Sequence, residues 1–392
     1  MNIKNAKFAI IHDWLLENSF GGAEKVTYVI DQLLINNFSE PDIFSLASNI
    51  NNLNDTFFKD RIIKTSFIQK LPFGKSKVQR YLPFLPFAIE QIDLCKYNVV
   101  ISSSHAFAKG VLTNPDQLHI SYIHTPMRYA WDQMYTYIKQ TNFSNYGFDI
   151  PIRYLLYKLR EWDFCSSQRI DRVISNSNFT AKRVKKYWGL DSKVINPPVD
   201  TKRFKYNNTR SDFYLSVNRL VPNKRIDLLI TAFNKLGLPL VIIGDGPERL
   251  KLEKIANKNI TFLKKQSDYK VEEYMSKCRA FVYAGIEDFG IAPIEAMASG
   301  APVIAYGKGG ILDSVNCINN CDKDKIATGV LFKKQTSADI FDTINWFQDK
   351  KIWKRFNSER LNYSTQKFST KNFLNKLESF INKAWEEFQM IL

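Results

Sequence analysis

The sequence predicts an α/β protein made of two doubly wound domains, each with a parallel sheet covered by helices on both faces. Short apolar runs such as FAII at 8–11 predict strands that are buried on both sides. Segments with helical spacing follow these runs. The alternation starts again near residue 213, and 392 residues exceed what one hydrophobic core usually organises.

The N-terminal half is predicted to alternate strands and helices. Strands are expected over KFAIIHD, YNVVISSS and HISYIHT, and a helix opened by two glycines is expected over GGAEKVTYVIDQLLINN. The segment RVISNSNFTAKRVKKYWGL repeats the order of strand, polar turn and helix, and a glycine follows the helix. Two prolines and a polar run in VINPPVDTKRFKYNNTRSDF then indicate a linker.

The C-terminal half is predicted to repeat the same plan. Strands are expected at 213–220, 238–246, 259–263, 279–285 and 302–306, with helices between them at 226–237, 249–257 and 271–278. The last two stretches, 341–356 and 373–392, have helical spacing. We therefore divide the chain into domains at 1–205 and 206–370 and a C-terminal helix at 371–392.

The net charge of +16 favours an anionic partner, which includes phosphorylated substrates, an acidic membrane surface and nucleic acid. Zinc fingers, aromatic RNA-binding motifs and basic DNA-binding helices are not found in the sequence, so nucleic acid is not expected. Cys317 and Cys321 have no further His or Cys pair that would complete a zinc site. Five scattered cysteines are typical of a reducing compartment rather than of a disulfide framework.

The segment Lys59 to Arg80 carries seven basic residues and one acid, with aromatic residues in and after it. This pattern suits a surface that rests on anionic lipid while apolar side chains enter the bilayer. A solvated basic loop over the edge of a core explains the same pattern equally well. The run FAII is too short for a signal peptide or a membrane span, so we expect a cytoplasmic protein, peripheral on the inner face of the membrane.

The stretch EDFGIAPIEAMASG places two carboxylates eight residues apart, after the predicted strand at 279–285. Glu287 is expected on the loop at the carboxyl end of that strand. Glu295 is expected in the first turn of a helix that has Pro293 near its start and Gly300 after its end. An isolated glutamate there would compensate the helix dipole, whereas a pair with free backbone N–H groups nearby can bind a nucleotide.

Two further motifs also lie where strands are predicted to end. In VNRLVPNKRID, Arg219 and Lys224 could neutralise a diphosphate leaving group, although exposed bases are common in loops. In FGGAEKV, Gly21 and Gly22 precede a helix and would let the backbone approach a phosphate.

Together these motifs resemble those of the retaining, nucleotide-sugar-dependent glycosyltransferases of family 4. FGGAEKV, HTP, VNRLVPNKRID, GDGPE and EDFGIAPIEAMASGAPVIA occur in the order and at the separations of that family, across nearly the whole chain. IIHDWL, SSSHAFAKGV and SYIHTPMRYAWD resemble bacterial GDP-mannose-dependent mannosyltransferases of O-antigen or exopolysaccharide synthesis. The resemblance implies the GT-B fold, in which two Rossmann-like domains face each other across a cleft and the C-terminal helices return to the first domain.

The resemblance also implies roles for individual residues. Arg219 and Lys224 would hold the donor diphosphate, and Glu295 would bind the ribose. Glu287 would contact hydroxyls of the transferred sugar, and His124 would lie near the reacting carbon, although a histidine at a strand end is often structural. The remaining expected donor-binding residues are Gly21, Gly22, Asp245, Gly246, Phe289, Gly290, Ile291 and Ala292. Residues expected on the acceptor side, where a structural role is nearly as well supported, are His12, Asp13, His105 and Lys109.

The implied reaction moves a hexose, most simply mannose from GDP-mannose, to a hydroxyl of a lipid-linked saccharide with retention of configuration. It is expected to use no cofactor and no metal. Asp322 to Asp324 imitate a metal-binding DxD motif, but the adjacent lysines dilute its charge. Lys264 replaces a glycine of the family beside the base pocket, and Asp313 replaces a glutamate. The lysine leaves a UDP-sugar donor open, whereas the aspartate is tolerable. The alternative from another class is a catalytically silent, basic, membrane-associated scaffold with the same fold, against which the intact set of Glu287, Glu295, Arg219 and Lys224 argues.

Overall fold

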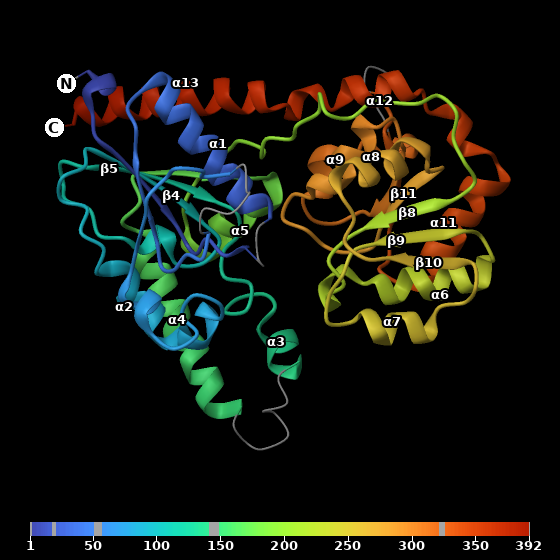
Figure 1. Ribbon diagram of the computed structural model, residues 1–392, viewed down its shortest axis with the longest axis horizontal. Helices are drawn as coiled ribbons and strands as arrows, with labels where there is room; N and C mark the ends of the chain where they lie inside the picture. The colour runs from blue at the N-terminus through green and yellow to red at the C-terminus, as the bar shows by residue number, and fades with distance from the viewer. Residues whose placement is uncertain (1, 18–20, 51–56, 141–148, 321–325, 392) are drawn as a thin grey trace. The chain divides into compact units, whose positions relative to one another are not determined.

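The structure, a computed structural model, divides the chain into two compact units (Figure 1). Unit 1 comprises Met1–Asn196 and Phe373–Leu392, and unit 2 comprises Pro197–Asn372. Residues 2–17, 21–50, 57–140, 149–320 and 326–391 are described. The boundary lies before the one predicted at residue 205, because the predicted linker packs into unit 2: Val199 and Phe204 are buried in its core. The C-terminal helix belongs to unit 1 from Phe373 onward.

Within the described residues, unit 1 holds a seven-stranded parallel sheet in the order β3-β2-β1-β4-β5-β6-β7. The order reverses between the adjacent strands β1 and β4, which makes this the switch point of a doubly wound sheet. The strands are β1 (Phe8–His12), β2 (Asp42–Ser45), β3 (Ile63–Thr65), β4 (Val99–Ser104), β5 (Leu118–Ile123), β6 (Arg172–Ser175) and β7 (Lys193–Val194).

Helices cover both faces of this sheet because successive side chains of each buried strand point to opposite sides. Phe8 and Ile10 of β1 pack with α1 and α13 in one core, whereas Ala9 and Ile11 pack with α2 and α4 in another. The helices of unit 1 are α1 (Gly22–Asn37), α2 (Leu85–Glu90), α3 (Met134–Gln140), α4 (Asp149–Ser167), α5 (Asn178–Trp188) and α13 (Thr370–Gln389). A short 3₁₀ helix, η4 (Val78–Phe84), precedes α2.

The described part of unit 2 contains a six-stranded parallel sheet in the order β10-β9-β8-β11-β12-β13. Its switch point lies between β8 and β11. The strands are β8 (Tyr214–Val217), β9 (Leu240–Ile243), β10 (Ile260–Leu263), β11 (Ala280–Tyr283), β12 (Val303–Tyr306) and β13 (Gly329–Phe332).

Unit 2 has the same three-layer construction. Tyr214 and Val282 pack with α6 and α11 on one face of the sheet, and Phe281 packs with α9 on the other. The helices are α6 (Ile226–Leu236), α7 (Arg249–Ile255), α8 (Asp268–Lys277), α9 (Ile291–Ala298), α10 (Ile311–Ser314), α11 (Ser337–Asp349) and α12 (Ser358–Ser364). The predicted α/β class with two doubly wound sheets is confirmed. A helix long and apolar enough to cross a membrane is not found among the described residues.

Candidate active site

The loops that follow β8 and β11 meet at the switch point of unit 2. Lys224 ends the short 3₁₀ helix η7 (Pro222–Lys224), and its Nζ atom donates a hydrogen bond to Glu287 on the loop after β11. The same Nζ atom lies 3.3 Å from the hydroxyl of Tyr283, the last residue of β11. The side chains of Lys224 and Glu287 are 19% and 20% exposed, so a ligand can reach both.

The Glu287 loop is held by close backbone packing. The carbonyl oxygen of Glu287 accepts a hydrogen bond of 2.8 Å from the N–H of Gly310. A Cβ atom on Gly310 would lie 2.1 Å from the carbonyl oxygen of Asp288, which only glycine avoids. Gly290 has a φ of +89°, in the left-handed region, and begins α9 without a side-chain cap. These glycines fix the direction in which the loop presents Glu287 and the N-terminus of α9.

Glu295 lies in the second turn of α9, one residue later than the first-turn position predicted, because the helix begins at Ile291. Its carboxylate lies 3.8 Å from Nη2 of Arg203. The Arg203 guanidinium also pairs with Asp268 at 2.7 Å and with Glu272 at 2.8 Å. Arg203, which the sequence did not single out, therefore holds an acidic group that includes Glu295.

The other donor-side residues differ in their surroundings. Arg219 is exposed on the loop after β8. The Asp245 carbonyl accepts a 2.9 Å hydrogen bond from Leu220, so the loops carrying Arg219 and Asp245–Gly246 are joined. Phe289 is 4% exposed and packs on the ring of Phe368 at 5.6 Å, which places it in the core. Ile291 and Ala292 form the first residues of α9 and are half-buried.

In unit 1, Asp13 follows β1 at the corresponding switch point and is fully buried. Its carboxylate accepts hydrogen bonds from the backbone N–H groups of 105–108, at 2.7 Å for His105 and 2.9 Å for Ala108. Burial opposes its charge, but the rings of His105 and His12 and these N–H groups hold its pKa below the ordinary value. Asp13 thus shapes the loop after β4, and its oxygens are already engaged.

His124 follows β5 and ends a chain of side-chain hydrogen bonds. Its Nε2 atom lies 2.8 Å from Oγ of Ser103, and Thr27 of α1 donates to the same Oγ at 2.8 Å. Nδ1 of His12 lies 3.0 Å from the Thr27 hydroxyl and 2.9 Å from the carbonyl oxygen of Ser103. Burial, helped by the neighbouring rings of His12 and His105, lowers the pKa of His124 to about 3, so its ring is neutral near pH 7.

The chain continues from His12 to the glycine pair. Nε2 of His12 lies 3.8 Å from Glu24, and the Glu24 carboxylate accepts a 2.8 Å hydrogen bond from the N–H of Gly21. Burial raises the pKa of Glu24, but the interactions with His12 and His105 and a backbone hydrogen bond together outweigh it, so the pKa lies below its ordinary value. His12 and Glu24 therefore connect His124 to the N-terminus of α1, where Gly21 is the N-cap and Gly22 is the first helical residue.

Lys109 has the surroundings of a structural residue. It is 1% exposed and pairs with Asp163 at 2.7 Å, and its Nζ atom also lies near Ser166 at 3.0 Å. The rings of Trp162 and Trp188 flank the ammonium at 4.9 and 5.0 Å. This geometry favours a buried ion pair over contact with an acceptor.

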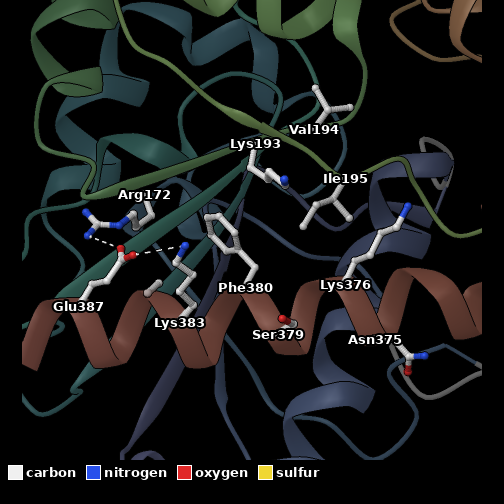
Figure 2. A pocket seen from close by; sticks show the side chains of 11 residues that line it. Arg172, Lys193, Val194, Ile195, Asn375, Lys376, Ser379, Phe380, Lys383 and Glu387 are labelled. Atoms are coloured by element: carbon white, nitrogen blue, oxygen red, sulfur yellow. Dashed lines mark hydrogen bonds and ion pairs between the residues drawn. The ribbon is translucent and has the colours of Figure 1, made fainter.

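Clusters of three or more potential metal ligands are not found among the described residues, and Asp322 to Asp324 lie outside them. A cavity of about 660 Å³ lies between α13 and the edge strand β7 (Figure 2). Glu387 there pairs with Arg172 at 3.0 Å and with Lys383 at 3.7 Å. The residues lining this cavity are outside the predicted site.

Two family models match the chain side by side. Residues 20–203 match the model described as Glycosyltransferase Family 4, and residues 198–367 match the model described as Glycosyl transferases group 1. Among solved structures, sucrose-phosphate synthase from Thermosynechococcus elongatus superposes with a TM-score of 0.72 over 97% of this chain and 100% of that one, at 16% identity. The chain has the GT-B glycosyltransferase fold.

Sequence relatives of this GT-B chain include two mannosyltransferases. An alpha-1,3/1,6-mannosyltransferase of Candida glabrata is 28% identical over 283 residues, which cover 58% of each chain. A GDP-mannose-dependent alpha-(1-6)-phosphatidylinositol monomannoside mannosyltransferase of Mycobacterium tuberculosis is 29% identical over 177 residues, which cover 37% of this chain and 46% of the relative. The chain thus spans less than two thirds of the length of either relative.

Sequence reasoning missed several residues that organise the candidate site. Thr27, Ser103 and Glu24 connect His124 to the glycine pair, and Tyr283 and Arg203 contact the donor-side charges. Glu24 sits three residues after Gly21, a spacing that could have indicated a back-reaching cap. Thr27 carries no comparable signal for its contact with Ser103, because the two residues are distant in sequence.

Proposed function

We propose that this protein is a retaining glycosyltransferase that moves mannose from GDP-mannose to a hydroxyl of a lipid-linked saccharide in bacterial O-antigen, capsule or exopolysaccharide synthesis. The observation that carries the proposal is the Lys224–Glu287 pair at the switch point of unit 2, with Glu295 on the adjoining helix. The two glycosyltransferase family matches support it.

The proposed donor site uses each charge for a different part of the nucleotide sugar. The Lys224 ammonium has three N–H donors, so it can keep Glu287 and also bind the diphosphate. Arg219, exposed on the same loop, adds a planar donor that suits phosphate oxygens. Glu287 then accepts from hydroxyls of the sugar, and Glu295 accepts from the ribose. Asp245, Gly246 and Gly290 border these groups in the proposed site.

The chemistry follows from the charge that develops as the sugar leaves. The anomeric carbon gains positive character while the diphosphate gains negative charge, which Arg219 and Lys224 stabilise. In the proposed retaining route, the departing phosphate accepts the proton of the acceptor hydroxyl on the same face of the sugar. The C–O bond to the acceptor forms as the bond to phosphate breaks, without a protein nucleophile. Since two cations balance the phosphates, we expect transfer without a metal or cofactor.

The choice of mannose and of GDP rests on the names of the two mannosyltransferase relatives. A UDP-sugar is the second candidate donor, because Lys264 after β10 replaces the glycine that the family has beside the base. A lysine at this position changes the shape and the charge of the surface beside the proposed base pocket. The donor base is therefore the part of the proposal that binding measurements must decide.

The acceptor side of the proposal places the protein on an anionic membrane surface at the inner face of the cell membrane. Two of the seven bases in Lys59 to Arg80 are engaged: Arg61 pairs with Asp31 at 2.9 Å, and Lys64 pairs with Asp42 at 2.8 Å. The other five are exposed, and they are Lys59, Lys70, Lys75, Lys77 and Arg80. The rings of Phe73, Phe84 and Phe87 beside them are 57–61% exposed, which suits insertion into a bilayer.

The experiment measures the binding of GDP, UDP, ADP and their sugars to the full chain. Thermal unfolding and calorimetry are the two readouts. Selective stabilisation by GDP and GDP-mannose supports the proposal, because a ligand that binds only the folded state raises its melting temperature. Selective binding of UDP compounds would leave a transferase but overturn mannose. Absence of any response would favour the silent scaffold. Turnover with the bound donor, repeated in EDTA, tests the expected metal independence.

A further inference from the structure

Unit 1 contains an apolar cavity of about 660 Å³ beside the loops that follow β4 and β5. Its apolar wall comes from η4, α2, α3 and α4, and includes Leu82, Leu85, Ile138, Ile152 and Leu156. This volume falls within the range of about 300–1,000 Å³ that is usual for small-molecule sites. The cavity is therefore large enough to hold part of a lipid hydrocarbon chain.

Polar groups gather at one side of this cavity. His105 and Thr125 come from the loops after β4 and β5, and Arg128 and Tyr129 follow closely in the chain. The His105 ring lies 3.1 Å from the Asp13 carboxylate and its side chain is 23% exposed, so it is held yet accessible. The lining thus combines an apolar wall with a basic, hydrogen-bonding side.

The hydroxyl of Tyr129 gives a second, independent indication of a ligand. It is buried and has no hydrogen-bond partner among the described residues. A buried hydroxyl without a partner is unfavourable in a folded protein, and such groups usually have one. A ligand oxygen bound in the cavity that Tyr129 lines would satisfy it.

We propose that this cavity binds the apolar chain of a lipid phosphate, with the phosphate at the side formed by His105, Arg128 and Tyr129. The inference rests on the proposed function, because it assigns the chain to the acceptor lipid. Thr125 lines the cavity and directly follows His124. The lipid phosphate would then lie near the reacting hydroxyl, so the acceptor carries a short saccharide.

The segment that lines the cavity also offers a route by which a lipid chain could enter the cavity from a membrane. Leu82 of η4 lines the cavity, while Phe84, at the end of the same 3₁₀ helix, is 58% exposed. Phe73 is also exposed and lies under the Arg80 guanidinium at 5.2 Å. A segment that rests on a bilayer through these rings would bring a lipid chain to the wall formed by η4.

The test is calorimetric titration of the full chain with farnesyl phosphate and with farnesol, without any nucleotide. Leu82→Trp and Ile152→Trp fill the cavity from two half-buried positions, and each should weaken farnesyl phosphate binding about tenfold or more. Tyr129→Phe removes only the unpartnered hydroxyl, so it should fold normally and weaken farnesyl phosphate about three- to tenfold. It should leave farnesol binding unchanged. Leu250→Trp, at a 74% exposed position in unit 2, is the matched control and should bind like the wild type.

Three outcomes would overturn the proposal: no binding of farnesyl phosphate, equal binding of farnesyl phosphate and farnesol, or full binding by folded tryptophan variants. A thermal melt of each variant separates lost binding from lost folding. Because the titration contains no nucleotide sugar, its failure refutes the cavity assignment and leaves the donor site standing. Failure of donor binding would likewise leave the titration interpretable.

Discussion

Lys224 and Glu287 form an ion pair that connects the loop after β8 to the loop after β11, at the point where the strand order of unit 2 reverses. Both side chains keep about one fifth of their surface exposed. A pair at that depth adds little stability, because water still screens it. Its main effect is therefore to hold a cation and a carboxylate at fixed positions, as the proposed donor site requires.

Replacing Glu287 by alanine should reduce kcat/KM for transfer by a factor on the order of 10²–10³, because it removes a group that contacts the sugar as charge develops. Steady-state transfer with the identified donor measures the effect. Asp227→Ala, which breaks the more exposed Arg225–Asp227 pair of the same unit, is the control and should keep near-normal turnover. Near-normal turnover of the Glu287 variant would contradict the assigned site.

Thr27 is predicted to act as a positioning residue through Ser103 and His124. Thr27→Val removes the hydroxyl that donates to Ser103, so we expect kcat to fall about tenfold with little change in the donor KM. Thr27→Ser keeps the hydroxyl and should retain most of the wild-type kcat. If Thr27→Val keeps near-normal kcat, or if Thr27→Ser loses as much activity as Thr27→Val, the hydroxyl does not account for the effect, and the positioning role is wrong.

Two buried histidines should make folding weaken in mild acid. Burial lowers both pKa values to about 3, helped by the charge of Arg169 for His119 and by the neighbouring rings of His12 and His105 for His124. Both side chains protonate near pH 6.5 once unfolded. The unfolded chain therefore binds more protons between pH 6.5 and about 3, and the free energy of unfolding falls as pH falls through that window.

The expected slope is at most about 1.4 kcal/mol per pH unit for each histidine. Urea unfolding at several pH values between 7 and 4.5 measures it. His119→Gln should remove the contribution of one histidine to this slope, even if the substitution also changes the free energy of unfolding at every pH. An unchanged slope would mean that His119 is protonated in the folded protein. Asp13 and Glu24 affect the pH dependence of the free energy of unfolding only below about pH 4.5. Their pKa values in the folded protein lie under the ordinary values of 3.8 and 4.5.

Charge reversal in the basic segment should weaken membrane binding. Lys75→Glu with Lys77→Glu should lower the bound fraction on phosphatidylglycerol-containing vesicles at least about tenfold, because each cation near an anionic surface contributes about 1 kcal/mol. Vesicle co-sedimentation measures the change. Lys182→Glu with Lys186→Glu, two exposed positions on α5, alters the net charge equally and is the control. Equal losses in both double variants would assign the effect to net charge alone.

Much of the fold was predictable because the buried strands of a parallel sheet are short continuous apolar runs. β1, β4, β8, β9 and β11 fall within their predicted segments, and β5 begins one residue before its predicted segment. The edge strands β3 and β7 were not anticipated, because IKT and KV are too short and polar to stand out. The unit boundary was misplaced because Val199 and Phe204 pack into unit 2 from a stretch that has a linker composition.

The positions of the charged residues were predictable from motif order, since Glu287, Lys224 and Glu295 occupy loops and a helix that the pattern places after strands. The connections between His124 and Gly21 were not, because Thr27 and Ser103 are 76 positions apart and meet only in the folded sheet. Burial also distinguishes residues that a sequence treats alike. Lys109 is enclosed by two tryptophans, whereas Lys224 stays accessible.

The most direct measurement is calorimetric titration of GDP-mannose into the wild type and into Lys224→Ala. The proposed site predicts that the wild type binds GDP-mannose, and that loss of the ammonium weakens binding about tenfold to a hundredfold, the cost of a charge-assisted hydrogen bond. Lys235→Ala, at the end of α6, serves as the control and should bind normally. Equal affinity of the wild type and Lys224→Ala would contradict the donor site assigned to unit 2.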